Sequence, residues 1–180
     1  MAKILKSFIS EAKEIQSIPF VDHRGQFINL YRSYEETFTK SWGDRKIVQI
    51  NLSITNKVGS IRGLHFQKLP SKEAKLVRCL KGKVWDVAVD LREGSNTYGQ
   101  YFSTQLSPEK GNALLVPEGF GHGFQVIEEN SEVLYLCSDN WIPELEAGIR
   151  WNDPTLNIKW PLPLGDISEK DSSLPFLKNN

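Results

Sequence analysis

The sequence predicts an all-β protein built as an antiparallel sandwich or barrel, with a few short helices at its periphery. Three observations carry this prediction. Short apolar segments recur at roughly ten-residue spacing, breaks of Pro, Gly and Asn-Ser separate them, and helix signals are few. The 180 residues are enough for one sizeable core. No internal repeat, linker or low-complexity stretch interrupts the chain, so we expect a single domain over residues 1–180.

The first two elements expected along the chain are a helix and a strand. Residues 33–42 (SYEETFTKSW) have Ser33 as the expected N-cap and Glu36 as its capping-box partner. Residues 46–54 (KIVQINLSI) alternate apolar and polar side chains, the period of a half-buried strand. The apolar side chains of this strand are Val48, Ile50, Leu52 and Ile54.

The middle of the chain predicts a succession of strands. Residues 75–92 are expected to form two strands around Lys81-Gly82; in the second, Trp85, Val87, Val89 and Leu91 share one face, and Asp86 and Asp90 lie on the other. Three further strand segments follow, which are NALLVP (112–117), GFQVIEE (123–129) and EVLYLCSD (132–139). The prolines after Trp160 indicate a tail of turns and short helices that wraps the surface.

Composition excludes several classes of function. Lys+Arg and Asp+Glu are both 22, so the protein has no net field that would recruit nucleic acid or an anionic membrane. The two cysteines, Cys79 and Cys137, have no CxxC spacing and are expected to be buried free thiols in a reducing compartment. No apolar run approaches 18 residues. We therefore expect a soluble, cytoplasmic protein that holds any anionic ligand with local arginines and lysines.

Three segments contain side chains suited to chemistry: RGLHFQ (62–67), VPEGFGHGF (116–124) and VLYLCSD (133–139). A histidine of near-neutral pKa is the natural base for removing a proton beside a carbonyl group. That reaction also needs a donor at the enolate oxygen, an acid on the opposite face and a carboxylate that orients the base. His65, Lys75, Tyr135 and an aspartate supply these groups, although spacing alone does not bring them together. Each also has a structural interpretation, since Tyr135 suits a core strand and Lys75 a solvated strand start.

A series of motifs runs along the chain from Asp22 to Asp171. In order they are DHRGQF (22–27), VQINLS (48–53), RGLHFQ (62–67), KLVRCLKGKVWDVAVDLREGSNTYGQ (75–100), LVPEGFGHGF (115–124), LY (134–135), GIRWNDPTLNIKWP (148–161) and SEKD (168–171). With this order and spacing, the chain resembles the dTDP-4-dehydrorhamnose 3,5-epimerase family of the cupin superfamily. The resemblance implies a cupin-type jelly roll, which is an antiparallel β-sandwich.

The family resemblance implies an isomerase that needs neither metal nor organic cofactor. Such an enzyme inverts C3, C5 or both in a nucleotide-linked 4-keto-6-deoxyhexose, here expected to be dTDP-4-dehydro-6-deoxyglucose, through enolate intermediates. This activity implies a place in dTDP-rhamnose and polysaccharide biosynthesis. Family members are homodimers in which N-terminal residues of one subunit reach the partner's sheet and pocket, so we expect the same exchange here.

The resemblance also implies a role for particular residues. His65 matches the family's base, Asp171 the carboxylate paired with it, Tyr135 the acid, and Lys75 the cation near the C4 oxygen. Phosphate contacts are implied for Arg24 and Arg62, since guanidinium groups suit a pyrophosphate. The full set of implied substrate-binding positions is Arg24, Asn29, Gln49, Asn51, Arg62, His122, Glu146 and Lys170.

The spacing of Arg62 and His65 raises a question of geometry. Their odd separation would place them on opposite faces of a regular strand. Gly63 lies between them and permits a bulge or bend. We therefore expect a bulge that aims both side chains into one cavity.

The sequence departs from the family's pattern at four positions. Asn29 replaces an acidic residue, Gln26 an aromatic one, Asn140 a tyrosine, and Leu136 a lysine. The two replaced aromatic residues pack the nucleotide base in the family, and Trp141 is a possible substitute surface. The sequence thus leaves open a TDP- or CDP-linked substrate and inversion at one carbon or two. A ketoisomerase of the same superfamily and a non-catalytic sugar-nucleotide binding module are the alternative functions.

The PxGxxH pattern of Pro117, Gly119 and His122 matches the second metal motif of cupins. A cupin metal site also needs an HxH pair and a carboxylate, because a divalent ion requires three or four converging donors. His65 is followed by Phe66 and Gln67, so this pair is absent. We expect no bound metal, which disfavours a metal-dependent oxygenase.

Overall fold

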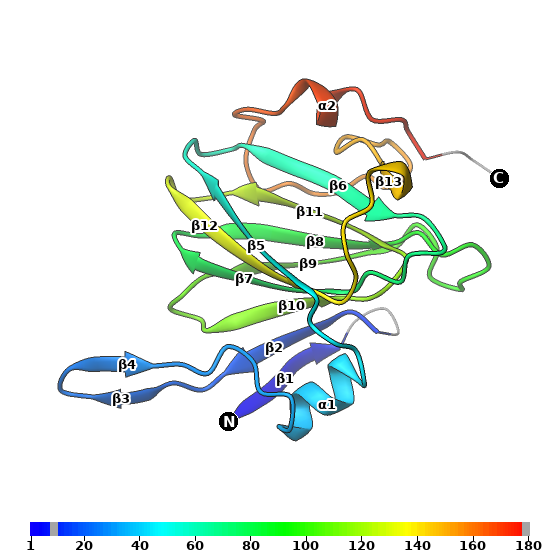
Figure 1. The fold of residues 1–180 in the computed structure, drawn as a ribbon. Coiled ribbons are helices and arrows are strands. Elements are labelled where there is room, and N and C mark those ends of the chain that lie inside the picture. The colour runs from blue at the N-terminus through cyan, green and yellow to red at the C-terminus, as the bar shows by residue number, and fades with distance from the viewer. Residues whose placement is uncertain (8–10, 178–180) are drawn as a thin grey trace.

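The computed structural model describes residues 1–7 and 11–177, which contain two facing antiparallel sheets and a separate two-stranded hairpin (Figure 1). Within these residues, the six-stranded sheet has the order β1-β2-β10-β7-β12-β5, and the five-stranded sheet has the order β13-β6-β11-β8-β9. The six-stranded sheet consists of β1 (Ala2–Ser7), β2 (Lys13–Ser17), β10 (Asn112–Val116), β7 (Lys75–Lys81), β12 (Ser131–Cys137) and β5 (Gln49–Thr55). The five-stranded sheet consists of β13 (Glu146–Gly148), β6 (Ile61–Gln67), β11 (Phe120–Val126), β8 (Val84–Asp90) and β9 (Tyr101–Leu106). The prediction of an antiparallel β-sandwich is confirmed.

The core lies between the inner faces of the two sheets, as alternation along each strand requires. Val77 and Val133 of the six-stranded sheet belong to one buried cluster with Ala88 and Phe124 of the five-stranded sheet. On β8, Asp86 and Asp90 share the inner face with Ala88, and both aspartates are fully buried. The two sets of side chains therefore lie on opposite faces of β8, as expected. The face that carries the aspartates points into the core.

The outer face of the five-stranded sheet is also buried, because the C-terminal segment covers it. Val87 and Val89 of β8 pack there against Ile149, Leu156 and Ile158. This segment contains turns and the short helix α2 (Glu169–Ser172), which lies beside β6 (Figure 1). Both faces of β8 are consequently shielded from water.

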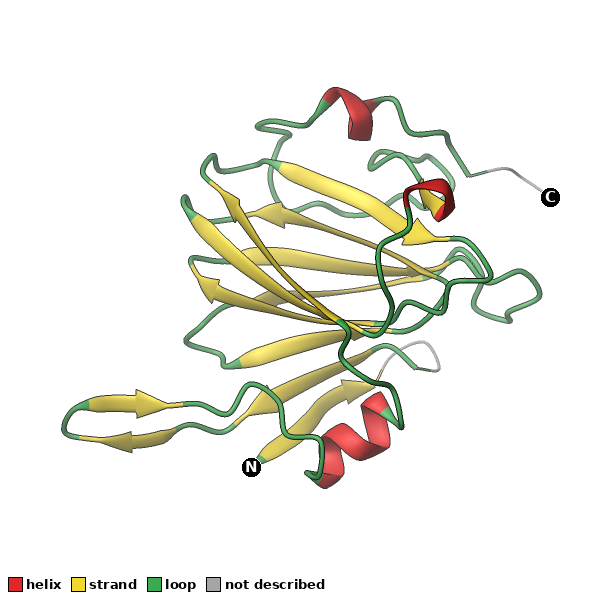
Figure 2. Ribbon diagram, viewed as in Figure 1, coloured by secondary structure: helices red, strands yellow, loops and turns green. Residues whose placement is uncertain are grey.

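The helix predicted over 33–42 is shorter, and its predicted cap was wrong. Helix α1 (Glu36–Trp42) has Glu35 as its N-cap residue, with no side-chain capping bond. The Glu35 carboxylate instead accepts a hydrogen bond from the Ala2 amide, and the Glu35 amide closes a turn onto the Arg32 carbonyl. Bonding to β1 therefore takes the place of the capping box. Other helical elements are the single turns η1 (Pro143–Leu145) and α2 at the periphery (Figure 2).

Strand β5 was predicted correctly as a strand, but the expected burial of its faces is reversed. Ile50, Leu52 and Ile54 are 63%, 52% and 55% exposed, although they are the apolar members of the alternation. The intervening Gln49, Asn51, Ser53 and Thr55 face the other sheet. β5 is the last strand of its sheet, and the side chains on its outer face remain exposed in a single chain. The polar face of β5 thus points inward, where it lines a cavity.

A hairpin of β3 (Phe20–Asp22) and β4 (Gly25–Phe27) projects away from the sandwich (Figure 1). It forms its own two-stranded sheet. Phe20, Val21 and Phe27 on it are 57%, 74% and 64% exposed. Apolar side chains of this size, unburied on one small element, are typical of an interaction surface.

Candidate active site

A polar cavity of about 390 Å³ opens between the two sheets. Strands β5, β7 and β12 supply one wall, and β6, β11 and β13 supply the other. The C-terminal segment completes the lining with residues before and within α2. Side chains far apart in the sequence therefore meet here because the two inner faces oppose each other.

A bulge in β6 directs two cavity residues to the same side. His65 pairs with His122 of β11, and Arg62 pairs with Phe124, so three steps along β6 match two along β11. Gly63 adopts φ +100°, and a Cβ there would lie 2.5 Å from the carbonyl oxygen of His122. Both Arg62 and His65 line the cavity. The bulge predicted at Gly63 is confirmed.

His65 and Asp171 form a charge-assisted pair at the cavity wall. The distance between His65 Nε2 and Asp171 Oδ1 is 2.7 Å, and the Gly63 amide donates to Asp171 Oδ2 at 2.9 Å. Burial raises the pKa of Asp171, but hydrogen bonds from His65 and Gly63 outweigh it and hold this pKa below its ordinary value. Asp171 is thus held as a carboxylate that orients the imidazole.

A second histidine–carboxylate pair consists of His122, which lines the cavity, and Asp86, which is buried behind it. His122 Nε2 is 2.9 Å from Asp86 Oδ1, and the two side chains are 5% and 0% exposed. Burial raises the pKa of Asp86, against the opposing charge and hydrogen bond of His122. The His122 ring meets the Tyr135 ring edge-on, with 5.8 Å between the centroids.

Tyr135 comes from β12, on the sheet opposite His65. It shares the inner face of its strand with Val133 and Cys137, as the alternation predicts. Burial raises the pKa of the Tyr135 phenol, and the charge of Asp86 raises it further; Arg62 and the Ser53 side chain act in the other direction. The phenol therefore holds its proton well above neutral pH.

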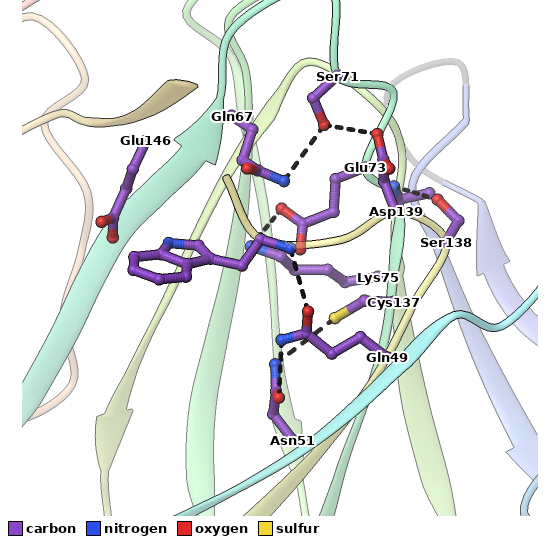
Figure 3. Close-up of polar contacts among 12 residues, drawn as sticks. Gln49, Asn51, Gln67, Ser71, Glu73, Lys75, Cys137, Ser138, Asp139 and Glu146 are labelled. Carbon is purple, nitrogen blue, oxygen red and sulfur yellow. Dashed lines mark hydrogen bonds and ion pairs between the residues drawn. The ribbon is translucent and has the colours of Figure 1, made fainter. Parts of the chain in front are cut away.

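Lys75 begins β7 and points into the cavity, where Glu73 is its ion-pair partner. The Nζ–Oε2 distance is 3.3 Å, and the two side chains are 16% and 9% exposed. Figure 3 shows this pair beside Gln49, Asn51 and Cys137. Glu73 holds the ammonium group in place and balances its charge.

The segment after β12 is fixed at the cavity rim by the side chains of Gln49 and Gln67. The Gln49 side-chain oxygen accepts from the Trp141 amide at 3.0 Å, and the Gln49 nitrogen donates to Asn51 at 2.9 Å. The Gln67 side chain accepts from the Ile142 amide and donates to the carbonyl of residue 140. It also donates to Ser71, as Figure 3 shows. These bonds hold the 53% exposed Trp141 indole against the cavity.

Cations and carboxylates also line the outer part of the cavity. Lys170 is 2.7 Å from Glu146, and that lysine lowers the pKa of Glu146 against the opposing effect of burial. Exposed Arg62 donates from Nε to Thr55 Oγ1 at 2.9 Å, which fixes its guanidinium at the rim. These groups are suited to binding an anionic ligand.

The structure brings together ten of the twelve residues selected from the sequence. They are His65, Tyr135, Asp171, Lys75, Gln49, Asn51, Arg62, His122, Glu146 and Lys170. Arg24 instead lies on the β3–β4 hairpin, where it pairs with Asp22 at 2.6 Å, and Asn29 follows that hairpin outside the cavity lining. Within one chain, neither residue reaches the cavity.

Sequence reasoning missed several contributors to the site. Glu73 and Ser53 line the cavity beside Lys75 and Tyr135, and Asp86 binds His122 from below it. Two of these carry a signal in the sequence. Glu73 precedes Lys75 by two positions, and Ser53 continues the inward-facing alternation of Gln49 and Asn51.

Within residues 1–7 and 11–177, two kinds of feature are absent. No three His, Cys, Asp or Glu side chains in these ranges lie close enough together to hold a metal ion. Helices of the length and hydrophobicity needed to cross a membrane are also absent from this part of the chain.

Comparisons with known proteins give a consistent result. Residues 6–179 match the family model described as dTDP-4-dehydrorhamnose 3,5-epimerase. An enzyme of that name from Sinorhizobium fredii is 43% identical over 170 residues, which are 94% of this chain and 86% of the relative.

Solved structures of such enzymes have the same fold. The Bacillus anthracis enzyme, solved with TDP and PPi bound, superposes with a TM-score of 0.93 and 35% identity, covering 98% of this chain and all of that one. The Legionella pneumophila enzyme, in complex with dTDP-4-keto-L-rhamnose, has a TM-score of 0.91 and 36% identity, covering 98% and 93% of the two chains.

Proposed function

The chain belongs to the dTDP-4-dehydrorhamnose 3,5-epimerase family, and from that premise we propose that it is an isomerase that epimerises a dTDP-linked 4-keto-6-deoxyhexose. The observation that carries this proposal is the pair of side chains, His65 and Tyr135, that line one cavity from opposing sheets. A keto group acidifies the adjacent C–H bonds. A base on one face removes the proton, and an acid on the other face returns one with inverted configuration.

His65 is the proposed base. Asp171 accepts a hydrogen bond from Nε2, which leaves Nδ1 as the atom that takes the proton. As the imidazolium forms, the adjacent carboxylate stabilises its charge. Because the pKa of Asp171 is lowered by its two hydrogen bonds, this stabilisation is available at neutral pH.

Lys75 is the proposed cation beside the C4 oxygen. When the proton leaves carbon, negative charge develops on that oxygen, and an ammonium group fixed in a partly buried site stabilises it. Glu73 keeps the ammonium group inside the cavity, 3.3 Å from its own carboxylate.

Tyr135 is the proposed acid. Its phenol is protonated at neutral pH because burial and the charge of Asp86 raise its pKa. Its position on β12, across the cavity from β6, supports delivery of a proton to the face of the sugar opposite His65.

The rim residues are proposed to bind the nucleotide. Arg62 and Lys170 supply positive charge for the diphosphate. The exposed indole of Trp141 offers a stacking surface for the base, an interaction that contributes on the order of 1–3 kcal/mol. Stacking alone accepts more than one pyrimidine, so the proposal extends to a CDP-linked sugar. It also covers inversion at C3, C5 or both.

Hydrogen exchange with solvent tests this function. We expect the protein to move deuterium from D₂O into C3 or C5 of dTDP-4-keto-6-deoxyglucose and to form an inverted product, with no loss of rate in the presence of a chelator. CDP- and GDP-linked sugars serve as comparison substrates. NMR of the product separates epimerisation from keto-group migration, and absence of exchange across the panel would refute the proposal.

We also propose a homodimer that acts in the cytoplasm and in which the β3–β4 hairpin of one copy completes the pocket of the other. Two observations support the exchange. The hairpin and the outer face of β5 expose large apolar side chains, and Arg24 lies outside its own chain's cavity. Such an assembly would bury both apolar surfaces and bring an arginine to the partner's diphosphate site.

Subunit complementation tests this assembly. Arg24→Ala and His65→Ala homodimers should each lose most activity, because each lacks one part of every site. Mixed dimers contain one intact site, so co-refolding equal amounts should restore about a quarter of wild-type activity. Recovery of nothing, together with a monomeric mass in light scattering, would contradict the proposed dimer.

A further inference from the structure

Resting on the proposed function, we propose that Ser71 and Asp139 are positioning residues that hold Trp141 in place to bind the base of the nucleotide. Neither of these two side chains is part of the cavity lining, so neither is placed to contact the substrate. The Trp141 indole does line the cavity and is half-exposed. Ordering a mobile side chain lowers affinity, so a stacking surface gains from being fixed before the ligand arrives.

Asp139 joins the segment that leads to Trp141 to the loop between β6 and β7. Its Oδ2 accepts from the Ser71 hydroxyl at 2.8 Å and from the Lys72 amide at 3.1 Å. Its Oδ1 accepts from the amide of residue 140 at 2.9 Å. The Ser71 hydroxyl, helped by the two amides, holds the pKa of this carboxyl below its ordinary value against the effect of burial. Asp139 is therefore a carboxylate with a donor on each oxygen, which fixes its orientation.

Ser71 continues the connection to Gln67 on β6 (Figure 3). A hydroxyl has one proton, and the Ser71 proton is donated to Asp139. The Ser71 oxygen therefore accepts, and Gln67 Nε2 donates to it at 3.2 Å. The same orientation of the Gln67 amide lets it donate to the carbonyl of residue 140 and accept from the Ile142 amide. Asp139 and Ser71 thus stabilise the side chain that binds the backbone on both sides of Trp141.

Ser138 adds bonds between the same two segments. Its hydroxyl accepts from the Ala74 amide at 2.7 Å and donates to the Lys72 carbonyl at 3.1 Å, and its own amide donates to the Ala74 carbonyl at 3.0 Å. The loop held in this way leads into β7 at Lys75, the proposed cation of the sugar site. The position of Trp141 is thereby fixed relative to this cation.

This arrangement predicts an affinity that depends on the base of the ligand. Pyrophosphate has the charge that Arg62 and Lys170 are proposed to bind, but it has no ring for Trp141 to stack on. A nucleoside diphosphate has both. Loosening the bonds of Ser71 and Asp139 should therefore weaken binding of dTDP or CDP more than binding of pyrophosphate. The ratio of the two affinities measures the effect, because a change of charge at Asp139 acts on both anions alike.

Asp139→Ala and Ser71→Ala test the inference by isothermal calorimetry with dTDP and CDP, and with pyrophosphate measured by competition. The preference for the nucleotide over pyrophosphate should fall by about fivefold in each variant, since the ligand must now order the indole. Ser71→Thr keeps the hydroxyl that donates to Asp139 and should retain the preference within about twofold. Ser71→Ala removes a single hydroxyl group, so the test does not depend on whether Asp139→Ala folds.

Trp141→Ala shows whether the effect passes through the indole. This variant should lose about tenfold of the preference. Adding Asp139→Ala or Ser71→Ala to it should have almost no further effect, because the surface that they position is gone. An unchanged preference in both single variants, or an equal loss with and without the indole, would overturn the inference, as would wild-type protein that binds neither nucleotide more tightly than pyrophosphate. Wild-type protein that prefers the nucleotide but exchanges no substrate hydrogen would refute the proposed function alone.

Discussion

The two histidine–carboxylate pairs of the cavity contain the same groups at similar distances, and yet their surroundings differ. His65 and His122 are cross-strand partners on the adjacent strands β6 and β11. His65 is 32% exposed and His122 only 5%. Both oxygens of Asp171 are bonded, whereas Asp86 Oδ2 has no hydrogen-bond partner among the described residues. Burial and hydrogen-bond number, rather than the identity of the groups, distinguish the pairs.

This difference assigns the pairs different tasks. Asp171 has a lowered pKa and a partner histidine open to the cavity, so His65 can accept a proton and later release it. Asp86 has a pKa raised by burial, and its charge disfavours ionisation of the neighbouring Tyr135 phenol. In the proposed mechanism, the first pair therefore moves protons, and the second shapes the environment of the proposed acid.

The same substitution at both histidines tests the division of tasks most strongly. His65→Asn should reduce kcat by about 10²- to 10⁴-fold, because it removes the proposed general base. His122→Asn should reduce it by about 10- to 100-fold, the usual effect of a group that acts through a neighbour. Rates of substrate deuterium exchange measure both. Equal losses in two folded variants would contradict the division of tasks.

The exposed pair includes His65, which follows a bulge in β6. This bulge can be tested at Gly63. Gly63→Ala should lower the free energy of unfolding by about 2–4 kcal/mol, because the φ is positive and the new methyl group meets a backbone carbonyl. Gly94→Ala is the matched control: φ is +79°, but nothing lies within 4 Å of the new carbon. Its loss should be about 1 kcal/mol. Urea unfolding measures both, and equal losses would count against the close approach at Gly63.

The smallest expected effect is the pH dependence of stability. Because the folded pKa of Asp171 is lowered, its contribution is present above the unfolded pKa of about 3.9 and is lost as pH falls. Because the folded pKa of Asp86 is raised, its contribution is present below that pH and is lost as pH rises.

The advantage of wild type over Asp171→Asn should therefore grow between about pH 3 and pH 5, and its advantage over Asp86→Asn should shrink as pH rises from about 4 toward neutrality. Urea unfolding of the three proteins across this range measures both trends. If the two differences change with pH in the same direction, the contrast between the carboxylates is wrong.

Much of the fold could be predicted from alternation and turn residues, because these are local properties. The strands around Val77 and Leu114 follow from their apolar runs. What alternation cannot supply is which face meets the core. On β5, the apolar Ile50 and Leu52 face outward and the polar Asn51 faces inward, since a polar cavity lies inside and the strand is at the sheet edge.

The site was predictable where motif residues sit on the sandwich itself. His65 and Tyr135 occupy one cavity because their strands lie on opposed sheets. Arg24 could not be placed from spacing, because it lies on a hairpin that leaves the body of its own chain. Asp86 looked like one aspartate among several, and its significance depends on burial beside His122, which only the three-dimensional structure reveals.

The most direct test of the central claim is Tyr135→Phe in D₂O, followed by NMR of the substrate carbons. His65 remains able to remove and return a proton on its own face, so deuterium should still enter the carbon within about tenfold of the wild-type rate, while inverted product falls by about 100-fold or more. Exchange without inversion is the predicted result. Inversion at the wild-type rate, or loss of exchange and inversion together in a folded variant, would contradict a base and an acid acting from opposite sheets.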